Sequence, residues 1–221
     1  MKKVAFFDFC ETLVNFQTAD AFVDFVRTKT KRHSMVVLEK VHKFMRKLRV
    51  IAVSEKLTGG RRSINKRLKL LQLRGFSRME IDNYAKAYYE ERLKPNFIAP
   101  LIDELKRLQR DNWEIVIVSG GYDVYLKLFV EEFGVQNLIS TKIKFKGKKC
   151  LGKMDGSDCL YENKTKALNQ LYDRDTLQSV SFSDSMSDLP FLSWTNEGVV
   201  VSRLTHKDWV DDYKFKEIIW T

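Results

Sequence analysis

The spacing of hydrophobic residues changes along the chain. A short apolar run from Val4 to Phe7 is typical of a buried strand, whereas apolar residues between about residues 16 and 95 recur at helical spacing. Beyond Pro100, short apolar runs such as Trp113 to Val118 again alternate with helical patterns. The sequence therefore predicts an α/β protein in which helices flank a parallel sheet and the first strand is followed by an all-helical insertion.

Caps and helix breakers divide the insertion into several helices. One helix is predicted from about Ser34, with an apolar stripe at helical spacing, and Thr58-Gly59-Gly60 is expected to end it. Ser77 to Glu80 matches a capping box, which predicts the start of a further helix. The apolar stripe of the first of these helices consists of Val37, Leu38, Val41, Met45 and Leu48.

These elements suggest two domains. A β-ribbon is predicted from Ile139 through Phe145, turning at Lys146-Gly147, and we expect it to form a flap beside the sheet. Residues 1–15 and 96–221 are predicted to form the α/β core, and residues 16–95 an antiparallel helical cap.

Composition narrows the setting of the protein. A hydrophobic fraction of 44% in 221 residues is enough for a substantial core, and no segment is long and apolar enough to span a membrane, so we expect no membrane partner. The three cysteines, Cys10, Cys150 and Cys159, are odd in number and lack the spacing of a metal site. This pattern predicts a reduced, cytoplasmic environment.

The net charge of +10 is unevenly distributed. Basic residues gather between Arg27 and Arg49 and again between Arg61 and Arg74. Such clusters are compatible with a solvated helical face, with a field that attracts anionic small molecules, or with a nucleic-acid surface. Neither an RNA-binding sheet signature nor a helix-turn-helix is evident, which argues against a nucleic-acid partner.

Polar residues follow three of the predicted strands. Asp8 follows the first strand, Ser119-Gly120-Gly121 follows a central strand, and Asp184 and Asp188 follow a later one. Because the carboxyl ends of parallel strands can share one edge of a sheet, these residues can converge there. Taken singly, each cluster could equally be a turn or a helix cap.

The residue types in these clusters suit phosphate chemistry. A serine and two glycines before a helix can bind an anion through a hydroxyl and backbone N–H groups. Asp184 and Asp188 suit a hard divalent cation such as Mg²⁺, which takes oxygen ligands. Three neighbouring carboxylates would repel one another unless cations lie among them, and Lys164 is a candidate for one such cation.

Together these motifs carry a family resemblance. In order and spacing the chain resembles the haloacid dehalogenase superfamily of phosphatases, in its phosphoserine-phosphatase-like branch, which has a Rossmann-like core and a helical cap. The resemblance covers nearly the whole chain. The matching pieces are Phe7-Asp8 to Thr12-Leu13, Val118 to Asp123, Lys164, and Ser183 to Pro190.

The resemblance implies a role for each piece. Asp8 would attack phosphorus and form an aspartyl-phosphate, and Mg²⁺ would be held by Asp8, the backbone carbonyl of Cys10, and Asp184. Asp188 would lie behind the metal or orient Lys164. The remaining roles would be binding of the phosphoryl oxygens by Ser119, Gly120 and Gly121 and neutralisation of charge by Lys164.

One departure from the family pattern affects catalysis. Active phosphatases of the family have a second aspartate two residues after the nucleophile, as general acid and base, and Cys10 stands at that position. A thiol is a poorer proton donor to an alkoxide leaving group than a carboxylic acid, and it cannot serve as an equivalent base. Glu11 is an alternative acid, although neighbouring side chains on an extended chain point in opposite directions.

A second departure concerns the substrate. Gln17 stands where phosphoserine phosphatases place a glutamate that meets the substrate ammonium, which argues against phosphoserine itself. Arg67 lies where a cap arginine of that family meets the substrate, and it could instead be one more solvated arginine.

These observations lead to a main hypothesis and its rivals. We expect a Mg²⁺-dependent phosphatase that hydrolyses a small phosphorylated metabolite through Asp8. Because Cys10 replaces the general acid and base, a catalytically impaired relative or a phosphotransferase is the alternative. A nucleic-acid binder that uses the basic cap is a remote third.

Overall fold

The computed structural model describes residues 1–30, 32–57 and 63–221. The described strands form one sheet in the order β4-β3-β2-β1-β5-β6-β7. Every neighbouring pair is parallel except β3 and β4, which form an antiparallel ribbon. The strands are β1 (Lys2–Phe7), β2 (Glu114–Tyr122), β3 (Asn137–Lys146), β4 (Lys149–Asp155), β5 (Leu177–Ser183), β6 (Glu197–Arg203) and β7 (Lys216–Trp220).

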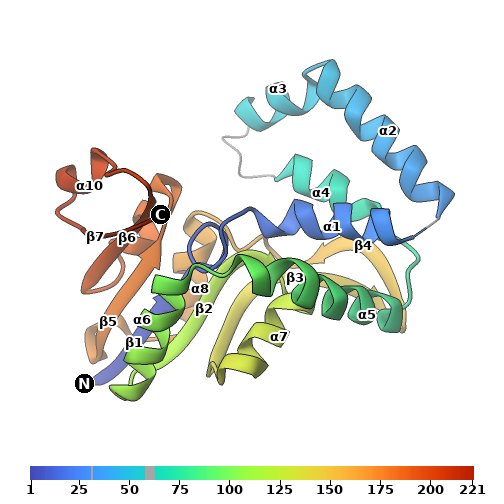
Figure 1. Ribbon diagram of the computed structural model, residues 1–221. Helices are drawn as coiled ribbons and strands as arrows, with labels where there is room; N and C mark the ends of the chain where they lie inside the picture. The colour runs from blue at the N-terminus through green and yellow to red at the C-terminus, as the bar shows by residue number, and fades with distance from the viewer. Residues whose placement is uncertain (31, 58–62) are drawn as a thin grey trace.

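A run of helices separates β1 from β2 in the chain, and further helices flank the sheet (Figure 1). A π-helical turn (Tyr89–Leu93) and a 3₁₀ turn (Lys94–Asn96) close the insertion. The α/β class with a mostly parallel, helix-flanked sheet is thus confirmed. The α-helices are α1 (Thr18–Lys29), α2 (His33–Lys47), α3 (Val50–Leu57), α4 (Ile64–Leu71), α5 (Arg78–Tyr88), α6 (Ala99–Arg110), α7 (Asp123–Phe133), α8 (Glu162–Leu171), α9 (Leu189–Leu192) and α10 (Trp209–Asp212).

The central strand β1 explains why the core is built around the first residues of the chain. Val4 to Phe7 are all buried, because β1 lies between β2 and β5 and both faces of the sheet are covered there. Phe7 stacks on Phe182 of β5 with ring centroids 4.3 Å apart. The continuous apolar run of β1 is therefore what a doubly covered parallel strand requires.

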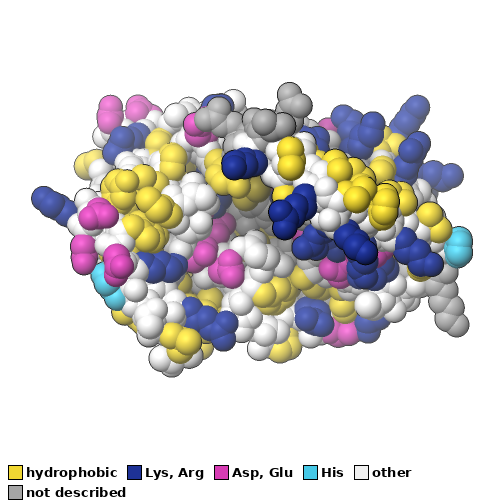
Figure 2. Space-filling view, turned by 90° about the horizontal axis from the view of Figure 1, so that it is seen from above, with side chains coloured by type: hydrophobic (Ala, Val, Ile, Leu, Met, Phe, Trp, Pro, Cys, Tyr) yellow, Lys and Arg dark blue, Asp and Glu magenta, His cyan; other side chains and the backbone are white. Residues whose placement is uncertain are grey.

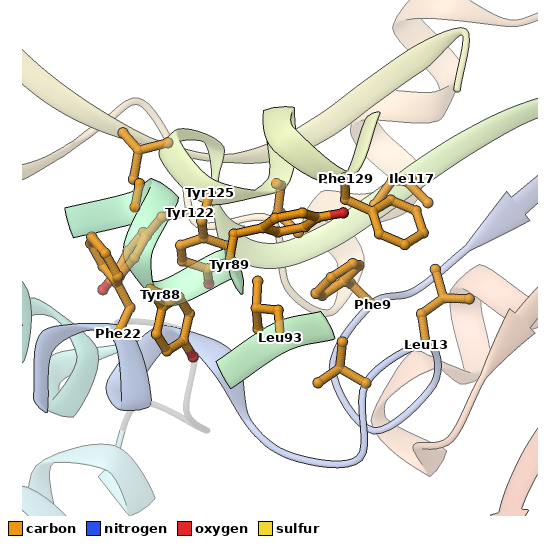
Figure 3. Packing of buried hydrophobic residues seen from close by; sticks show 14 of the residues in the cluster. Phe9, Leu13, Phe22, Tyr88, Tyr89, Leu93, Ile117, Tyr122, Tyr125 and Phe129 are labelled. Carbon is orange, nitrogen blue, oxygen red and sulfur yellow. The ribbon is translucent and has the colours of Figure 1, made fainter. Parts of the chain in front are cut away.

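Aromatic side chains join the inserted helices to the core (Figure 3). Phe22 of α1 lies 5.3 Å from the rings of both Tyr88 of α5 and Tyr125 of α7. The Tyr88 hydroxyl donates to the backbone carbonyl of Thr18 at 2.9 Å. These contacts join the inserted helices to the rest of the fold. The division into a core domain and a helical cap, with boundaries at residues 15 and 96, stays a prediction.

For the inserted helices, one local prediction is confirmed and others are not. The capping box of Ser77 and Glu80 is present at the start of α5. The single helix predicted from about Ser34 to Thr58 is instead divided into α2 and α3 between Lys47 and Val50, and Val37, Val41 and Leu48 of its apolar stripe are exposed. The break expected at Thr58-Gly59-Gly60 lies outside the described residues.

One further detail of the sheet differs from the prediction. The predicted ribbon is present as β3 and β4, but the C-terminal strand β7, which pairs with β6, was not anticipated. Among the described residues, no helix is long and apolar enough to cross a membrane.

Candidate active site

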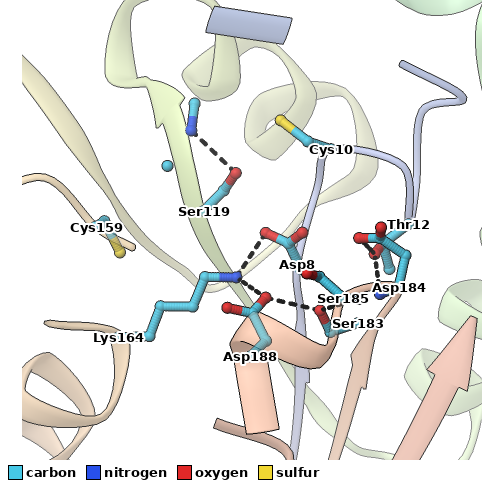
Figure 4. A network of polar contacts seen from close by, with 12 residues as sticks. Asp8, Cys10, Thr12, Ser119, Cys159, Lys164, Ser183, Asp184, Ser185 and Asp188 are labelled. Carbon is cyan, nitrogen blue, oxygen red and sulfur yellow. Dashed lines mark hydrogen bonds and ion pairs between the residues drawn. The ribbon is translucent and has the colours of Figure 1, made fainter. Parts of the chain in front are cut away.

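Three acidic side chains and a lysine meet at the carboxyl edge of the sheet (Figure 4). Asp8 follows β1, and its backbone N–H donates to the carbonyl of Phe182 in β5 at 2.9 Å. The ammonium of Lys164, on α8, lies 2.9 Å from Asp8 Oδ1 and 2.5 Å from Asp188 Oδ2. The residues that follow β1 and β5 therefore lie together at one edge of the sheet, as expected from the sequence.

Lys164 is fixed in position by its surroundings. Its side chain is 1% exposed, and its ammonium lies 5.1 Å from the centre of the Phe191 ring. Asp188 is oriented in turn, because the Ser183 hydroxyl donates to the same carboxylate oxygen at 2.7 Å. Asp188 thus holds Lys164 beside Asp8 through contacts within the protein alone.

Asp184 occupies the other side of Asp8. Its backbone N–H donates to Thr12 Oγ1 at 3.1 Å, so the loop after β1 and the loop after β5 are joined directly. The Lys207 ammonium donates to the backbone carbonyl of Asp184. The Asp184 carboxylate thus lies near Asp8, and within the described part of the chain no lysine forms an ion pair with it, although the charge of Lys207 opposes the rise of its pKa.

The acids of this cluster are short of positive charge. Burial raises the pKa of Asp8 to about 6, assisted by the charge of Asp188 and opposed by Lys164. Burial, together with the charges of Asp8 and Glu11, raises the pKa of Asp184 to about 7. A further cation at this edge would stabilise both carboxylates.

The donor atoms at this edge suit Mg²⁺ better than a soft metal. Among the described residues, no group of three or more His, Cys, Asp or Glu side chains could hold a metal ion. Mg²⁺ does not need such a cage, because it binds through one or two carboxylates and keeps several waters. Asp8 and Asp184 supply hard oxygen donors of that kind, so the residues present fit Mg²⁺.

The Cys10 side chain belongs to a different set of contacts. Its Sγ lies 3.1 Å from Thr18 Oγ1, which in turn lies 2.8 Å from the hydroxyl of Tyr125. In Figure 4 the sulfur points away from Asp184. Burial and the nearby charge of Asp8 raise the pKa of Cys10 to about 11. The thiol is therefore protonated at neutral pH.

Glu11, the alternative acid, is turned toward solvent. Its φ of 55° places it in the left-handed region, which is uncommon for a residue with a side chain. Its carboxylate accepts a hydrogen bond from Gln17 Nε2 at 2.5 Å. Both residues are exposed, but only Gln17 lines the cavity beside Asp8.

The Ser119-Gly120-Gly121 segment continues β2 instead of leaving it as a turn. The register with β3 shifts between Ser119 and Tyr122, and Ser119 Oγ accepts the N–H of Gly121 at 3.1 Å. A Cβ on Gly120 would lie 2.5 Å from Leu160 Cδ2. Glycine at position 120 therefore lets the backbone approach the cavity closely.

A cavity of about 310 Å³ lies over these groups. Of the residues predicted from sequence to form the site, several line it and others lie behind it or elsewhere. Ser119 is fully buried and Gly121 packs against Thr18 and Tyr125. Those that line the cavity are Asp8, Cys10, Gln17, Gly120, Lys164, Asp184 and Asp188.

Helix α4 contributes Lys66 to this cavity, a residue that sequence reasoning missed. Its ammonium donates to the carbonyl of Gly120 at 2.5 Å and to Thr141 Oγ1 at 3.2 Å, and it pairs with Asp158. The neighbouring Arg67 is exposed on α4 and does not line the cavity. Helical spacing could have suggested this, because the buried residues of α4 are Lys66, Lys69 and Leu70.

Comparison with known proteins agrees with this architecture. The family model of haloacid dehalogenase-like hydrolases matches residues 5–193. The chain belongs to this family. Comparison with curated proteins gave no match.

Solved structures of similar fold extend over the whole chain. A protein of unknown function from Bordetella pertussis Tohama I is 17% identical with a TM-score of 0.79, covering 99% of this chain and 98% of its own. A substrate-bound phosphoserine phosphatase is 17% identical with a TM-score of 0.66, covering 99% and 93%. A phospho-aspartyl intermediate analogue of phosphoserine phosphatase is 18% identical, with the same TM-score of 0.66 and coverages of 99% and 93%. At these identities the likeness establishes the fold, and the protein is a hydrolase of phosphatase-like architecture.

Proposed function

We propose that this protein is a Mg²⁺-dependent phosphatase that hydrolyses a small phosphorylated metabolite through an aspartyl-phosphate on Asp8. The observation that carries the proposal is the Asp8 carboxylate, which lines the cavity and lies 2.9 Å from the Lys164 ammonium. A nucleophilic carboxylate must be ionised and held in place. With a pKa near 6, Asp8 is largely ionised at neutral pH.

The residues around Asp8 would bind and neutralise the phosphoryl group. Gly120, the residue of this segment that lines the cavity, would hold a phosphoryl oxygen through its N–H, with Ser119 and Gly121 fixing the backbone behind it, and Lys164 would neutralise the charge that develops during transfer. Mg²⁺ would be held by Asp8, Asp184 and the backbone carbonyl of Cys10. When bound, it supplies further charge neutralisation between the carboxylates and the phosphate.

Cys10 limits the proton transfers of such a reaction. A thiol with a pKa near 11 is a weak acid toward a leaving alkoxide, and its thiolate is too scarce at neutral pH to activate water. Hydrolysis of the aspartyl-phosphate would then be slow. This observation favours the second candidate, a phosphotransferase or impaired relative, in which an alcohol acceptor takes the phosphoryl group from Asp8.

The cavity walls favour a small, polar substrate. Gln17, Asp20 and Lys66 line the part contributed by the cap, and a volume of about 310 Å³ suits a metabolite. Gln17 brings no negative charge to meet an ammonium, which argues against phosphoserine as the substrate. The charge of Lys66 is paired with Asp158, so this lysine holds the cavity wall in place, and a substrate contact of Arg67 stays a prediction.

Phosphate release from an aryl phosphate, with and without Mg²⁺, tests the main proposal. Wild-type protein should release phosphate only with Mg²⁺, and Asp8→Asn should abolish release because the amide cannot attack phosphorus. Asp173→Asn, an exposed position in the chain, is the matched control. Equal rates for wild type and Asp8→Asn would exclude Asp8 as the nucleophile.

A trapping experiment separates hydrolysis from phosphotransfer. Labelled substrate, followed by acid quench, should leave an acyl-phosphate on wild-type protein. Adding small alcohols then accelerates loss of the label if the chain is a phosphotransferase and has no effect if water is the acceptor. A screen of phosphorylated metabolites would identify the substrate.

A further inference from the structure

Helix α2 presents its apolar side to solvent. Val37 is 44% exposed, Val41 50%, Phe44 61% and Leu48 57%, and their spacing of three and four places them on one stripe. Most amphipathic helices of a globular protein turn such a stripe toward the core. In α2 the arrangement is reversed.

Polar side chains occupy the inward side of α2. Glu39 is buried, accepts a hydrogen bond from Gln72 Nε2 at 2.8 Å and lies 3.7 Å from the Lys69 ammonium. His42 is buried as well, and its Nε2 lies 2.9 Å from Asn65 Oδ1. Glu39 and His42 are thus held inward by partners on other segments, and this orientation leaves the apolar stripe of α2 facing outward.

The exposed stripe continues onto α3 and is bordered by basic residues. Val50 and Val53 of α3 are exposed too. From residue 33 to residue 50 the chain has five basic residues and one acidic residue, the buried Glu39. In the view of Figure 2, hydrophobic and basic side chains lie close together on one side of the molecule. The outer α2–α3 face consists of Val36, Val37, Lys40, Val41, Lys43, Phe44, Lys47, Leu48, Val50 and Val53.

The charge of this face selects among possible coverings. A second copy of the chain would bring two basic faces together, and like charges at short range repel. A nucleic acid would use the basic residues but leave the aliphatic stripe exposed to water. An anionic lipid surface uses both, because apolar side chains enter the headgroup boundary while lysines contact lipid phosphates.

We propose that the outer α2–α3 face binds the surface of an anionic lipid bilayer, with α2 lying in the plane of the interface. This goes beyond the proposed phosphatase activity and does not depend on it. The sequence led us to expect no membrane partner because no segment could span a bilayer. Binding in the interface requires no spanning helix, only an apolar stripe with basic flanks.

Vesicle flotation of the full chain tests the proposal. Vesicles of phosphatidylcholine alone are compared with vesicles that also contain phosphatidylserine, at low and high salt. Val41→Ser with Phe44→Ser removes apolar contacts, and Lys40→Glu with Lys47→Glu reverses charge. Matched controls elsewhere are Met79→Ser with Leu171→Ser for exposed apolar residues and Lys148→Glu with Lys153→Glu for exposed lysines.

The wild-type chain should float with the anionic vesicles, and salt should weaken binding because the lipid charge is screened. Each α2 double variant should lower binding by about tenfold or more, while the matched controls bind as wild type. Because all substituted residues are exposed, the variants are expected to keep the wild-type melting temperature, which is measured alongside.

Three results would overturn the proposal. The first is no binding to either vesicle. The second is binding that survives both α2 variants. The third is a dimer in analytical ultracentrifugation that Val41→Ser with Phe44→Ser dissociates while vesicles fail to bind, which would assign the face to a second copy.

Discussion

Replacing Cys10 with aspartate should convert this chain into a faster phosphatase. The present thiol is buried, touches Thr18 Oγ1 at 3.1 Å and has a pKa raised to about 11. At pH 7 a group with that pKa is ionised in roughly one molecule in 10⁴, so it contributes almost nothing as a base. An aspartate would bring a carboxyl group to the same cavity wall.

The size of the gain follows from general acid–base catalysis. Such groups typically contribute about 10²- to 10⁴-fold, which corresponds to about 3–5 kcal/mol of activation free energy. Burial and the charge of Asp8, which raise the pKa of the Cys10 thiol, would also raise the pKa of the new carboxyl. A raised carboxyl pKa lies closer to neutral pH and suits both donation and acceptance of a proton.

Steady-state phosphate release from an aryl phosphate and from an alkyl phosphate measures this effect. The alkyl ester is the more demanding substrate, because its alkoxide leaving group needs a proton, so Cys10→Asp should accelerate it more. Cys10→Asn is the matched control, with the same size and no acid. If Cys10→Asp and Cys10→Asn release phosphate at the same rate, the acid–base interpretation of position 10 is wrong.

The remaining predictions concern charge in and around the cavity. Lys164→Met should lower the free energy of unfolding by about 3–5 kcal/mol in denaturant titration, because Asp8 loses its buried partner, whereas exposed Lys166→Met should not. Lys66→Gln should lower the free energy of unfolding by about 3–5 kcal/mol, because the buried Asp158 carboxylate loses its ion pair, whereas exposed Arg67→Gln should change it little. Equal losses for the two variants would contradict this role of Lys66. Without metal, the melting temperature should fall as pH rises from about 4 to about 7. In the folded protein the pKa of Asp8 is raised to about 6 and that of Asp184 to about 7. Stability that is present below pH 4 is therefore lost as each carboxyl ionises in the folded state. Mg²⁺ should reduce this fall, and identical profiles with EDTA and with Mg²⁺ would contradict a metal site at these carboxylates.

Sequence pattern predicted what depends on local order and on parallel topology. The continuous apolar run of β1 required a strand covered on both faces, and a parallel sheet then brought Asp8, Asp184 and Asp188 to one edge. Three neighbouring carboxylates called for a cation, and the family resemblance singled out Lys164 among the 39 lysines and arginines. None of these inferences required knowledge of how the cap packs.

The features that escaped prediction depend on that packing. Lys66 and Arg67 are adjacent basic residues, and only the direction in which α4 faces the core decides which one reaches the cavity. Val41 marks an apolar stripe that periodicity detects, but periodicity cannot say whether the stripe faces inward. In α2 the buried partners of Glu39 and His42 decide the orientation, and these partners lie on other segments of the chain.

The surroundings of Cys10 show that its departure from the family pattern is confined to one side chain. Thr18 begins α1, its hydroxyl lies between the Cys10 thiol and the Tyr125 hydroxyl, and its carbonyl accepts the Tyr88 hydroxyl. The first turn of the cap is therefore anchored at the point where it meets residue 10. A carboxylate at position 10 would find the Thr18 hydroxyl already within reach as a hydrogen-bond donor, which would hold it in place. The site thus retains the partner that a general acid needs, so a single substitution is a fair test of whether the missing acid limits the rate.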